Sequence, residues 1–219
     1  MEKSTPSRTE RVGRTRRERG AKAVSEVRRG LILEAAREAF AELGLAGASL
    51  REIARRAGYT PGALYSYFDS KEAIYGALLG ESLERLNRCV AEALTDGTPP
   101  LETLRAAATA FYGFYRDQPQ ELDLGFYLFN GVRPTGLTPA WNDRLNRRLR
   151  DALAPIEQAL IAAGRSPADA TRATTALFAQ IVGLLILRHS GRIRMFGQHA
   201  DALLADHLDS VVAGLPIQR

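Results

Sequence analysis

The sequence has few of the residues that form disulfides, metal sites and membrane spans. Its 219 residues include one cysteine, Cys89, so no disulfide forms within the chain and no cysteine metal site can be built. There is no continuous apolar run of the roughly 18 or more residues that a membrane span requires. No apolar segment follows the N-terminal charges, as it would in a secretory signal. These absences predict a soluble, cytoplasmic protein without a membrane partner.

Patterns that mark enzymes are missing as well. The sequence contains no GxSxG, Walker or dinucleotide-binding glycine pattern. Its histidines are His189, His199 and His207, and the last two stand about two helical turns apart, which is too far for joint metal binding. Solvated surface positions, or one contact with an effector, suit them better. We therefore expect no catalytic residues, no cofactor and no metal site.

The excess positive charge lies at the N-terminus. The net charge is +5, and residues 1–29 hold ten Lys or Arg against four Asp or Glu, whereas the other 190 residues carry 20 basic and 21 acidic groups. Residues 1–24 also have few apolar side chains, so we expect a disordered basic arm. This arm either lies along DNA or enters its minor groove, or it is only a solubilising tail. Both interpretations stay open.

The segment from residue 49 to residue 71, SLREIARRAGYTPGALYSYFDSK, predicts two short helices joined by a tight turn. Ser49 and Glu52 have the spacing of a capping box at the start of the first helix. Gly58 follows that helix, where a left-handed backbone conformation commonly ends it. Thr60 can cap the second helix, and Pro61 fits its first turn because no N–H is needed there.

The second of these helices presents a surface with almost no acidic side chains. The exposed positions are small or carry hydroxyl groups, with one cation at the flank: Gly62, Ala63, Tyr65, Ser66, Tyr67 and Lys71. Such a surface can approach a phosphodiester backbone and place small side chains near base edges. A helix, a turn and a second helix of this kind are typical of DNA-binding proteins. A three-helix packing unit that contacts no DNA has the same local pattern.

The segment also resembles a known family. The helix from Ser49 to Gly58, the run YTPGALYSYF at 59–68 and Lys71 match the N-terminal domain of TetR-type transcriptional repressors at nearly every fixed position. The match covers about residues 28–75, and the rest resembles the family only in length and helical character. The resemblance implies an all-α fold. A three-helix helix-turn-helix DNA-binding domain over residues 25–75 would precede a larger helical domain for effector binding and dimerisation over residues 76–219.

The resemblance also implies specific contacts with double-stranded DNA. Arg51 is implied as a base contact and Lys71 as a phosphate contact. Pro61 and Ser66 occupy variable positions of sequence recognition, and Pro61 can offer only apolar contact because it has no donor. The complete set implied to bind DNA is Ser49, Arg51, Thr60, Pro61, Gly62, Ala63, Tyr65, Ser66, Tyr67 and Lys71.

The body of the chain is expected to be helical. Apolar spacing predicts helices over residues 25–43, 71–94, 139–163, 169–189 and 199–214. Seven of the sixteen aromatic residues lie between residues 111 and 129. With the resemblance, this cluster indicates a cavity for a small, mostly apolar effector, although the same residues could be ordinary core. The candidate ligand-binding residues are Phe111, Tyr115, Phe126, Phe129, Asn130 and Trp141.

The last two long helices, about 168–190 and 199–214, contain more apolar surface than one chain can cover. The resemblance implies that they pair with their copies in a homodimer. Two short recognition helices set about 34 Å apart, or a multiple of it, would recognise a palindromic operator.

The resulting hypothesis is a ligand-responsive transcriptional regulator, a repressor that a small effector releases from its operator. The helix after Lys71 would transmit the change. An architectural DNA-binding protein without an effector is the alternative. An enzyme in which the helix-turn-helix is incidental is the third hypothesis.

Overall fold

The computed structural model describes residues 8–126 and 137–214, with side chains from residue 19 onward, and all regular structure in these residues is helical. The chain divides into two compact units, residues 1–78 and 79–219. This division falls three residues beyond the boundary expected from the sequence. Each unit has its own apolar core.

The first unit contains α1 (Arg8–Gly47), α2 (Leu50–Arg56), α3 (Pro61–Tyr65) and the first turns of α4 (Lys71–Glu92). Its core is formed by apolar side chains that recur at helical spacing, and the ring of Phe40 meets that of Tyr75 edge-on at 5.8 Å. The buried members are Ile32, Leu33, Ala35, Ala36, Ala39, Phe40, Leu45, Ala48, Ile53, Ala54, Leu64, Phe68, Ile74, Tyr75, Ala77 and Leu78.

The start of α1 differs from the sequence prediction. We expected a disordered arm up to residue 24 and a helix from residue 25, whereas the described helix begins at Arg8. The physical reason lies in composition, because Arg, Glu and Ala are good helix formers and no proline interrupts residues 7–60. The other end agrees with the prediction, since Gly44 has φ +70° and breaks the helix after Leu43.

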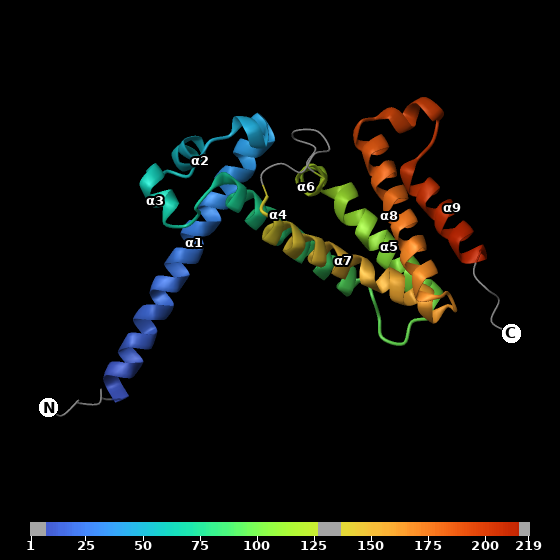
Figure 1. The fold of residues 1–219 in the computed structure, drawn as a ribbon, viewed down its shortest axis with the longest axis horizontal. Helices are drawn as coiled ribbons and strands as arrows, with labels where there is room; N and C mark the ends of the chain where they lie inside the picture. The colour runs from blue at the N-terminus through green and yellow to red at the C-terminus, as the bar shows by residue number, and fades with distance from the viewer. Residues whose placement is uncertain (1–7, 127–136, 215–219) are drawn as a thin grey trace. The chain divides into compact units, whose positions relative to one another are not determined.

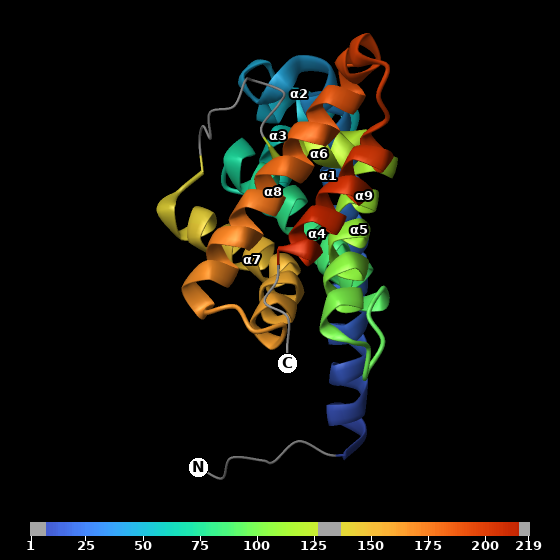
Figure 2. The same ribbon diagram turned by 90° about the vertical axis from the view of Figure 1, so that its right-hand side faces the viewer.

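The second unit contains the rest of α4 together with α5 (Pro100–Asp117), α6 (Pro119–Gly125), α7 (Pro139–Ala162), α8 (Pro167–His189), a 3₁₀ turn η1 (Arg192–Phe196) and α9 (Ala200–Ala213). Four of these helices begin with proline, whose fixed φ suits the first turn. In Figures 1 and 2, α5, α7, α8 and α9 lie side by side, with α7 against α5 and α8 and with α9 against α8.

The apolar helix α8 is only partly covered by its own chain. It is long and apolar enough to meet the length and composition criterion for a membrane span, and one third of the qualifying window is buried. Ile186 on α8 is 40% exposed, and on η1 Met195 and Phe196 are 75% and 65% exposed. In this part of the chain, uncovered apolar surface therefore lies on α8 and on the turn η1 that follows it.

Candidate nucleic-acid interface and effector pocket

Local hydrogen bonds fix the helix-turn-helix as the sequence predicted. The Ser49 hydroxyl accepts a hydrogen bond from the Glu52 N–H at 3.2 Å, and the Thr60 hydroxyl accepts one from the Ala63 N–H at 3.2 Å. Each bond satisfies an otherwise unpaired donor at a helix start. Gly58 has φ +73°, a conformation that L side chains rarely adopt. Both predicted caps and the predicted glycine turn are therefore confirmed.

The second predicted contact of the capping box, between the Glu52 carboxylate and the Ser49 N–H, is not formed. The Glu52 carboxylate does not return to Ser49 but lies 2.7 Å from the Arg55 Nη2 and 2.7 Å from the Arg56 Nε. Hydrogen bonds from Arg55 and then Arg56 lower the pKa of Glu52 to about 2. Arg56 also reaches Glu42 of α1 at 2.7 Å. Glu52 thus holds two arginines of its own helix, and one of them, Arg56, links α2 to α1.

The surface of α3 carries most of the residues expected to bind DNA. Tyr65 is 55% exposed, and an atom added at the position of a Gly62 side chain would meet nothing within 4 Å. The Ser66 hydroxyl donates to the Ala63 carbonyl at 2.6 Å. Exposed residues of the expected set are Ser49, Arg51, Thr60, Pro61, Gly62, Tyr65 and Ser66, and Ala63 and Tyr67 are half-buried. The structure therefore brings these nine residues to the outer side of α2 and α3.

Lys71 has a structural role that the sequence did not suggest. Its Nζ donates to the carbonyl oxygens of Leu45, Ala46 and Ala48 at 2.8, 3.3 and 3.2 Å. An ammonium group has three N–H donors, so these three acceptors match its full capacity. In this structure Lys71 caps the carbonyl groups at the end of α1, and its expected contact with phosphate stays a prediction. The motif alone did not reveal this, because the acceptors lie some 25 residues earlier.

Two arginines of α1 border the α3 surface, and sequence reasoning did not select them. Hydrogen bonding to the Tyr67 side chain, together with the nearby Tyr59, raises the pKa of the Arg28 guanidinium. The Arg29 guanidinium stacks over the Phe68 ring at 5.4 Å. The only available signal was their helical register relative to the buried residues that follow. Arg28 adds an exposed positive charge beside the hydroxyl groups of α3.

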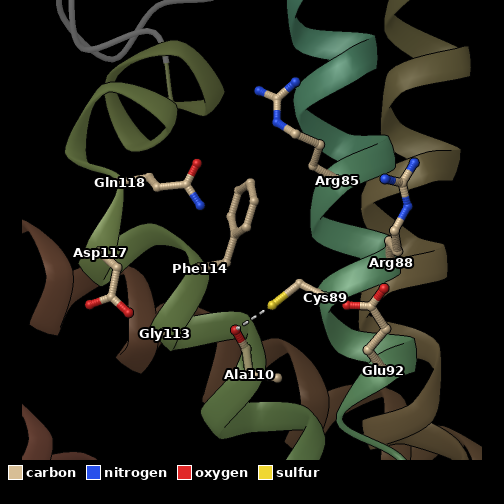
Figure 3. A pocket seen from close by; sticks show the side chains of 9 residues that line it. All are labelled: Arg85, Arg88, Cys89, Glu92, Ala110, Gly113, Phe114, Asp117 and Gln118. Atoms are coloured by element: carbon tan, nitrogen blue, oxygen red, sulfur yellow. Dashed lines mark hydrogen bonds between the residues drawn. The ribbon is translucent and has the colours of Figure 1, made fainter.

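A pocket of about 350 Å³ lies between α4 and α5 in the second unit (Figure 3). Phe114 projects toward α4, and the Cys89 thiol points to the Ala110 carbonyl at 3.9 Å. Burial raises the pKa of this thiol. The lining residues are Arg85, Arg88, Cys89, Glu92, Ala110, Gly113, Phe114, Asp117 and Gln118. The pocket has an apolar floor and a charged rim.

The two arginines of this pocket differ in their partners. Arg85 pairs at 2.5 Å with Glu121 of α6, whose side chain is almost fully buried. A buried carboxylate needs such a partner, so this arginine is committed to the fold. Arg88 is exposed and forms no ion pair among the described residues. The guanidinium of Arg88 is therefore available to an anionic group in the pocket.

The aromatic residues expected to bind a ligand are divided by the structure. Phe111 and Tyr115 are buried, with ring centroids 5.4 Å apart, and Phe126 meets Tyr115 at 5.5 Å. Phe111 also packs edge-on against Phe178 of α8 at 5.9 Å. These three candidates therefore pack against each other and α8, as core residues do. Trp141, at the start of α7, instead stacks with Arg144 at 5.6 Å, and Phe129 and Asn130 lie outside the described residues.

A smaller pocket of about 220 Å³ lies between α5 and α9. Arg116 at its edge lies 3.5 Å from Asp201 of α9, and Arg105 lies 2.6 Å from Asp209. Burial, and then the Asp201 carboxylate, raise the pKa of Tyr112 to about 12. Charges on both sides of this pocket are already paired, so it is less suited to a charged ligand than the pocket at Arg88.

Two family models match the chain. Residues 32–78 match the model described as bacterial regulatory proteins, tetR family, and residues 104–211 match the model described as tetracyclin repressor-like, C-terminal domain. The chain belongs to the TetR family of transcriptional regulators. Members of this family bind DNA, dimerise and bind small molecules, and they are transcription regulators rather than enzymes. The fold class predicted from the sequence is therefore confirmed.

Two curated relatives agree with this assignment. The transcriptional activator FasR of Mycolicibacterium smegmatis is 38% identical over 108 residues, or 49% of each chain. The transcriptional repressor KstR2 of Rhodococcus jostii is 38% identical over 85 residues, or 39% of this chain and 42% of that protein. The chain thus spans about half or less of the length of the curated relatives it matches.

A solved structure supports the fold over most of the chain. FadR of Bacillus subtilis in complex with stearoyl-CoA has a TM-score of 0.65 and 20% identity, covering 85% of this chain and 98% of that one. At this identity the likeness concerns the fold alone.

Proposed function

We propose that this TetR-family protein is a homodimeric regulator that recognises a palindromic operator through α2 and α3 and is controlled by a small amphipathic anion. The observation that carries the proposal is the α3 surface, where exposed hydroxyl groups and Gly62 stand beside Arg28 without an acidic side chain. Backbone and hydroxyl donors position a protein on phosphates, and small side chains permit approach to base edges.

The assignment of DNA contacts follows from exposure. Arg51 lies in the first turn of α2 and Thr60 caps the start of α3, and both side chains are exposed, as is Tyr65 at the end of α3. We assign base recognition to Arg51, Pro61 and Ser66, and phosphate positioning to Thr60 and the two tyrosines Tyr65 and Tyr67. Arg28 replaces Lys71 as the cation beside this surface.

The homodimer would form through α8 and α9. Support comes from the apolar surface that α8 leaves uncovered within its own chain. Ile186 of α8 and Val211 of α9 are among the apolar side chains that remain partly accessible. Burying such a surface against a second copy is favourable at about 25 cal/mol per Å² before association costs. A two-fold dimer also supplies the second recognition helix that a palindrome requires.

The pocket between α4 and α5 is the proposed effector site. Its apolar floor at Ala110, Gly113 and Phe114 would hold a hydrocarbon chain, and Arg88 would hold an anionic group. This ligand is amphipathic rather than mostly apolar, which refines the expectation from the aromatic cluster. FadR, a protein of the same fold, was solved with stearoyl-CoA, a ligand that has a hydrocarbon chain and anionic groups.

Helix α4 would couple effector binding to DNA binding. It is one helix from Lys71 to Glu92, so it carries both the cap on α1 and the pocket residues Arg85 and Arg88. Arg148 of α7 contacts the middle of α4, donating to the Gly80 carbonyl at 2.9 Å. A ligand that binds better to one position of α4 must change operator affinity by the same free energy as DNA changes ligand affinity.

A thiol-protection assay tests the effector site. Cys89 is the only cysteine, so the rate of its reaction with a thiol reagent reports pocket occupancy without ambiguity. Decanoate and decanoyl-CoA should slow the reaction. Arg88→Gln should lower the affinity for each of these two ligands about tenfold, because it removes one charge-assisted hydrogen bond. Uncharged decanol should be unaffected by Arg88→Gln, and Arg147→Gln on the exposed side of α7 is the matched control. Unchanged thiol reactivity with all three compounds contradicts this site.

The DNA proposal is tested by selecting duplexes from a random library and determining the stoichiometry on the selected sequence. A palindromic sequence bound by two chains is expected. Enrichment of a single, asymmetric half-site by one chain would contradict the dimeric operator. Equal retention of all sequences, with a steep dependence on salt, would instead support the architectural alternative.

A further inference from the structure

Helix α1 continues well beyond the core of the first unit. From residue 19 onward, the first buried residue of α1 is Ile32, and residues 19–28 are all exposed. Figure 1 shows α1 running on alone past α2 and α3. Residues 8–30 would span about 35 Å at the rise of an α-helix. In this stretch, called here the α1 extension, no residue from 19 to 28 is buried, and Arg28 at its end contacts Tyr67.

The α1 extension holds most of the chain's excess charge. Its sequence contains nine Lys or Arg against three Glu, a net charge of +6, whereas the chain as a whole carries +5. An exposed helix with this charge gains little from its own neighbours and much from a polyanion, because each phosphate contact releases counterions. Charge complementarity therefore favours nucleic acid as the partner.

The α1 extension leaves the core at the edge of the DNA-binding surface. Arg28 lies beside Tyr67 and Tyr59, and Arg29 stacks on Phe68, which directly follows the α3 surface. A helix that starts at this edge is continuous with the surface of α2 and α3. Its exposed residues Arg19 and Lys22 stand about two turns farther along the same helix.

Glycines make the α1 extension a weak helix when it is alone. Gly13, Gly20 and Gly30 each disfavour a helix relative to alanine. Gly20 and Gly30 have no packing reason, because a side chain added at either would meet nothing within 4 Å. A helix that is weak in isolation is stabilised when a ligand binds its helical form.

We propose that the α1 extension is a second DNA-binding element that follows the phosphate backbone outside the half-site and becomes firmly helical there. The inference rests on the proposed operator binding and adds a prediction of footprint. At about 35 Å the α1 extension reaches roughly one further helical turn of DNA, ten base pairs, beyond each half-site. A helical element of this kind contributes affinity without sequence preference.

A helical protein partner fits the same stretch less well. Val24, Val27 and Leu31 form an exposed apolar row at spacings of three and four residues. The row stops there, because the preceding positions of the same spacing are Gly20, Arg17 and Gly13. Three residues fall short of the three or more heptads that predict a coiled coil.

The test varies the flanks of a duplex selected from a random library, with arms of 0, 5, 10 and 15 base pairs beyond the selected sequence. Affinity should rise with flank length up to about ten base pairs and then level off. The full-length variant Arg19→Gln/Lys22→Gln should lose about tenfold or more on the long duplex and almost nothing on the shortest one. Its logarithmic salt slope should fall by about two to four for a dimer. The control Arg147→Gln/Arg150→Gln removes two exposed charges from α7 and should leave the affinity for the long duplex and the salt slope unchanged.

A second pair of variants tests the helical form. Gly20→Ala should raise affinity for the long duplex about two- to fivefold, since alanine favours the helix and has open space around it. Gly20→Pro should abolish the gain that long flanks give, because proline breaks a helix interior.

The outcomes separate this inference from the proposed function. Specific binding that is independent of flank length, with Arg19→Gln/Lys22→Gln matching the wild type, overturns the α1 extension as a DNA element and leaves operator recognition intact. Equal affinity of Gly20→Ala and Gly20→Pro overturns its helical form. Failure to enrich any sequence overturns the proposed function, and this inference with it.

Discussion

The two units of the molecule differ in how their functional residues are held. In the first unit, caps and ion pairs hold the α3 surface, with Ser49, Thr60 and Lys71 each bonded to backbone groups. In the second unit, aromatic packing of Phe111 and Tyr115 fills the interior, and the pocket lies on the other side between α4 and α5. The proposed recognition of DNA thus depends on local polar geometry, whereas the proposed effector site depends on how helices pack.

The largest expected effect comes from removing a ring of the aromatic core. Phe111→Ala should lower the free energy of unfolding by about 3–5 kcal/mol, because the side chain is fully buried between α5 and α8. Chemical denaturation checks this, with Leu64→Ala as the counterpart in the first unit. A cost below about 1 kcal/mol for Phe111→Ala would mean that the ring lines a cavity rather than a packed core.

The next effect distinguishes a structural cation from a phosphate ligand. Lys71→Met should destabilise the protein by about 1–3 kcal/mol, since it removes an ammonium group that donates to three carbonyl groups at the end of α1. Any loss of DNA affinity should come without a change in salt slope. A salt slope reduced by about 0.9 per subunit would instead support the contact between Lys71 and phosphate that the sequence suggested.

A smaller effect tests the hydroxyl groups of α3. Tyr65→Phe should weaken binding to specific and unrelated duplexes alike, by about 0.5–1.5 kcal/mol, as expected for one hydrogen bond to phosphate. Parallel titrations of two duplexes measure it. Loss on one sequence only would assign Tyr65 to base recognition.

The smallest effect is the pH response of α2. Because Arg55 and Arg56 lower the pKa of Glu52 to about 2, its contribution to stability is complete above its ordinary pKa near 4.5 and is lost as the pH falls toward 2. Glu52→Gln should remove this part of the acid dependence, which urea titrations at pH 2 to 5 would detect. An identical acid profile for the variant would show that the arginines hold the carboxylate no more strongly than water does.

The predictability of each region from sequence follows the same division. Ser49, Gly58 and Thr60 could be assigned because helix caps and left-handed turns depend on a few neighbouring residues. Helix boundaries with an initial proline, such as Pro139, were predicted closely for the same reason. These features require no knowledge of the tertiary fold.

What the sequence could not supply depends on contacts between distant segments. Lys71 caps carbonyl groups that precede it by 23–26 residues. The Glu52 carboxylate accepts hydrogen bonds from arginine side chains instead of from the Ser49 N–H at the start of its helix. Arg88 was not selected, because its value as an anion site depends on Arg85 being paired with the distant Glu121. An aromatic cluster likewise does not say from sequence whether its rings surround a ligand or each other.

The most direct test of the central claim is fluorescence anisotropy of a duplex selected by the protein against a scrambled duplex of the same composition, at about physiological salt. We predict a preference of at least about a thousandfold for the selected duplex, with most of it lost in the double variant Arg51→Ala/Ser66→Ala. Equal affinity for the two duplexes would contradict sequence recognition by α2 and α3.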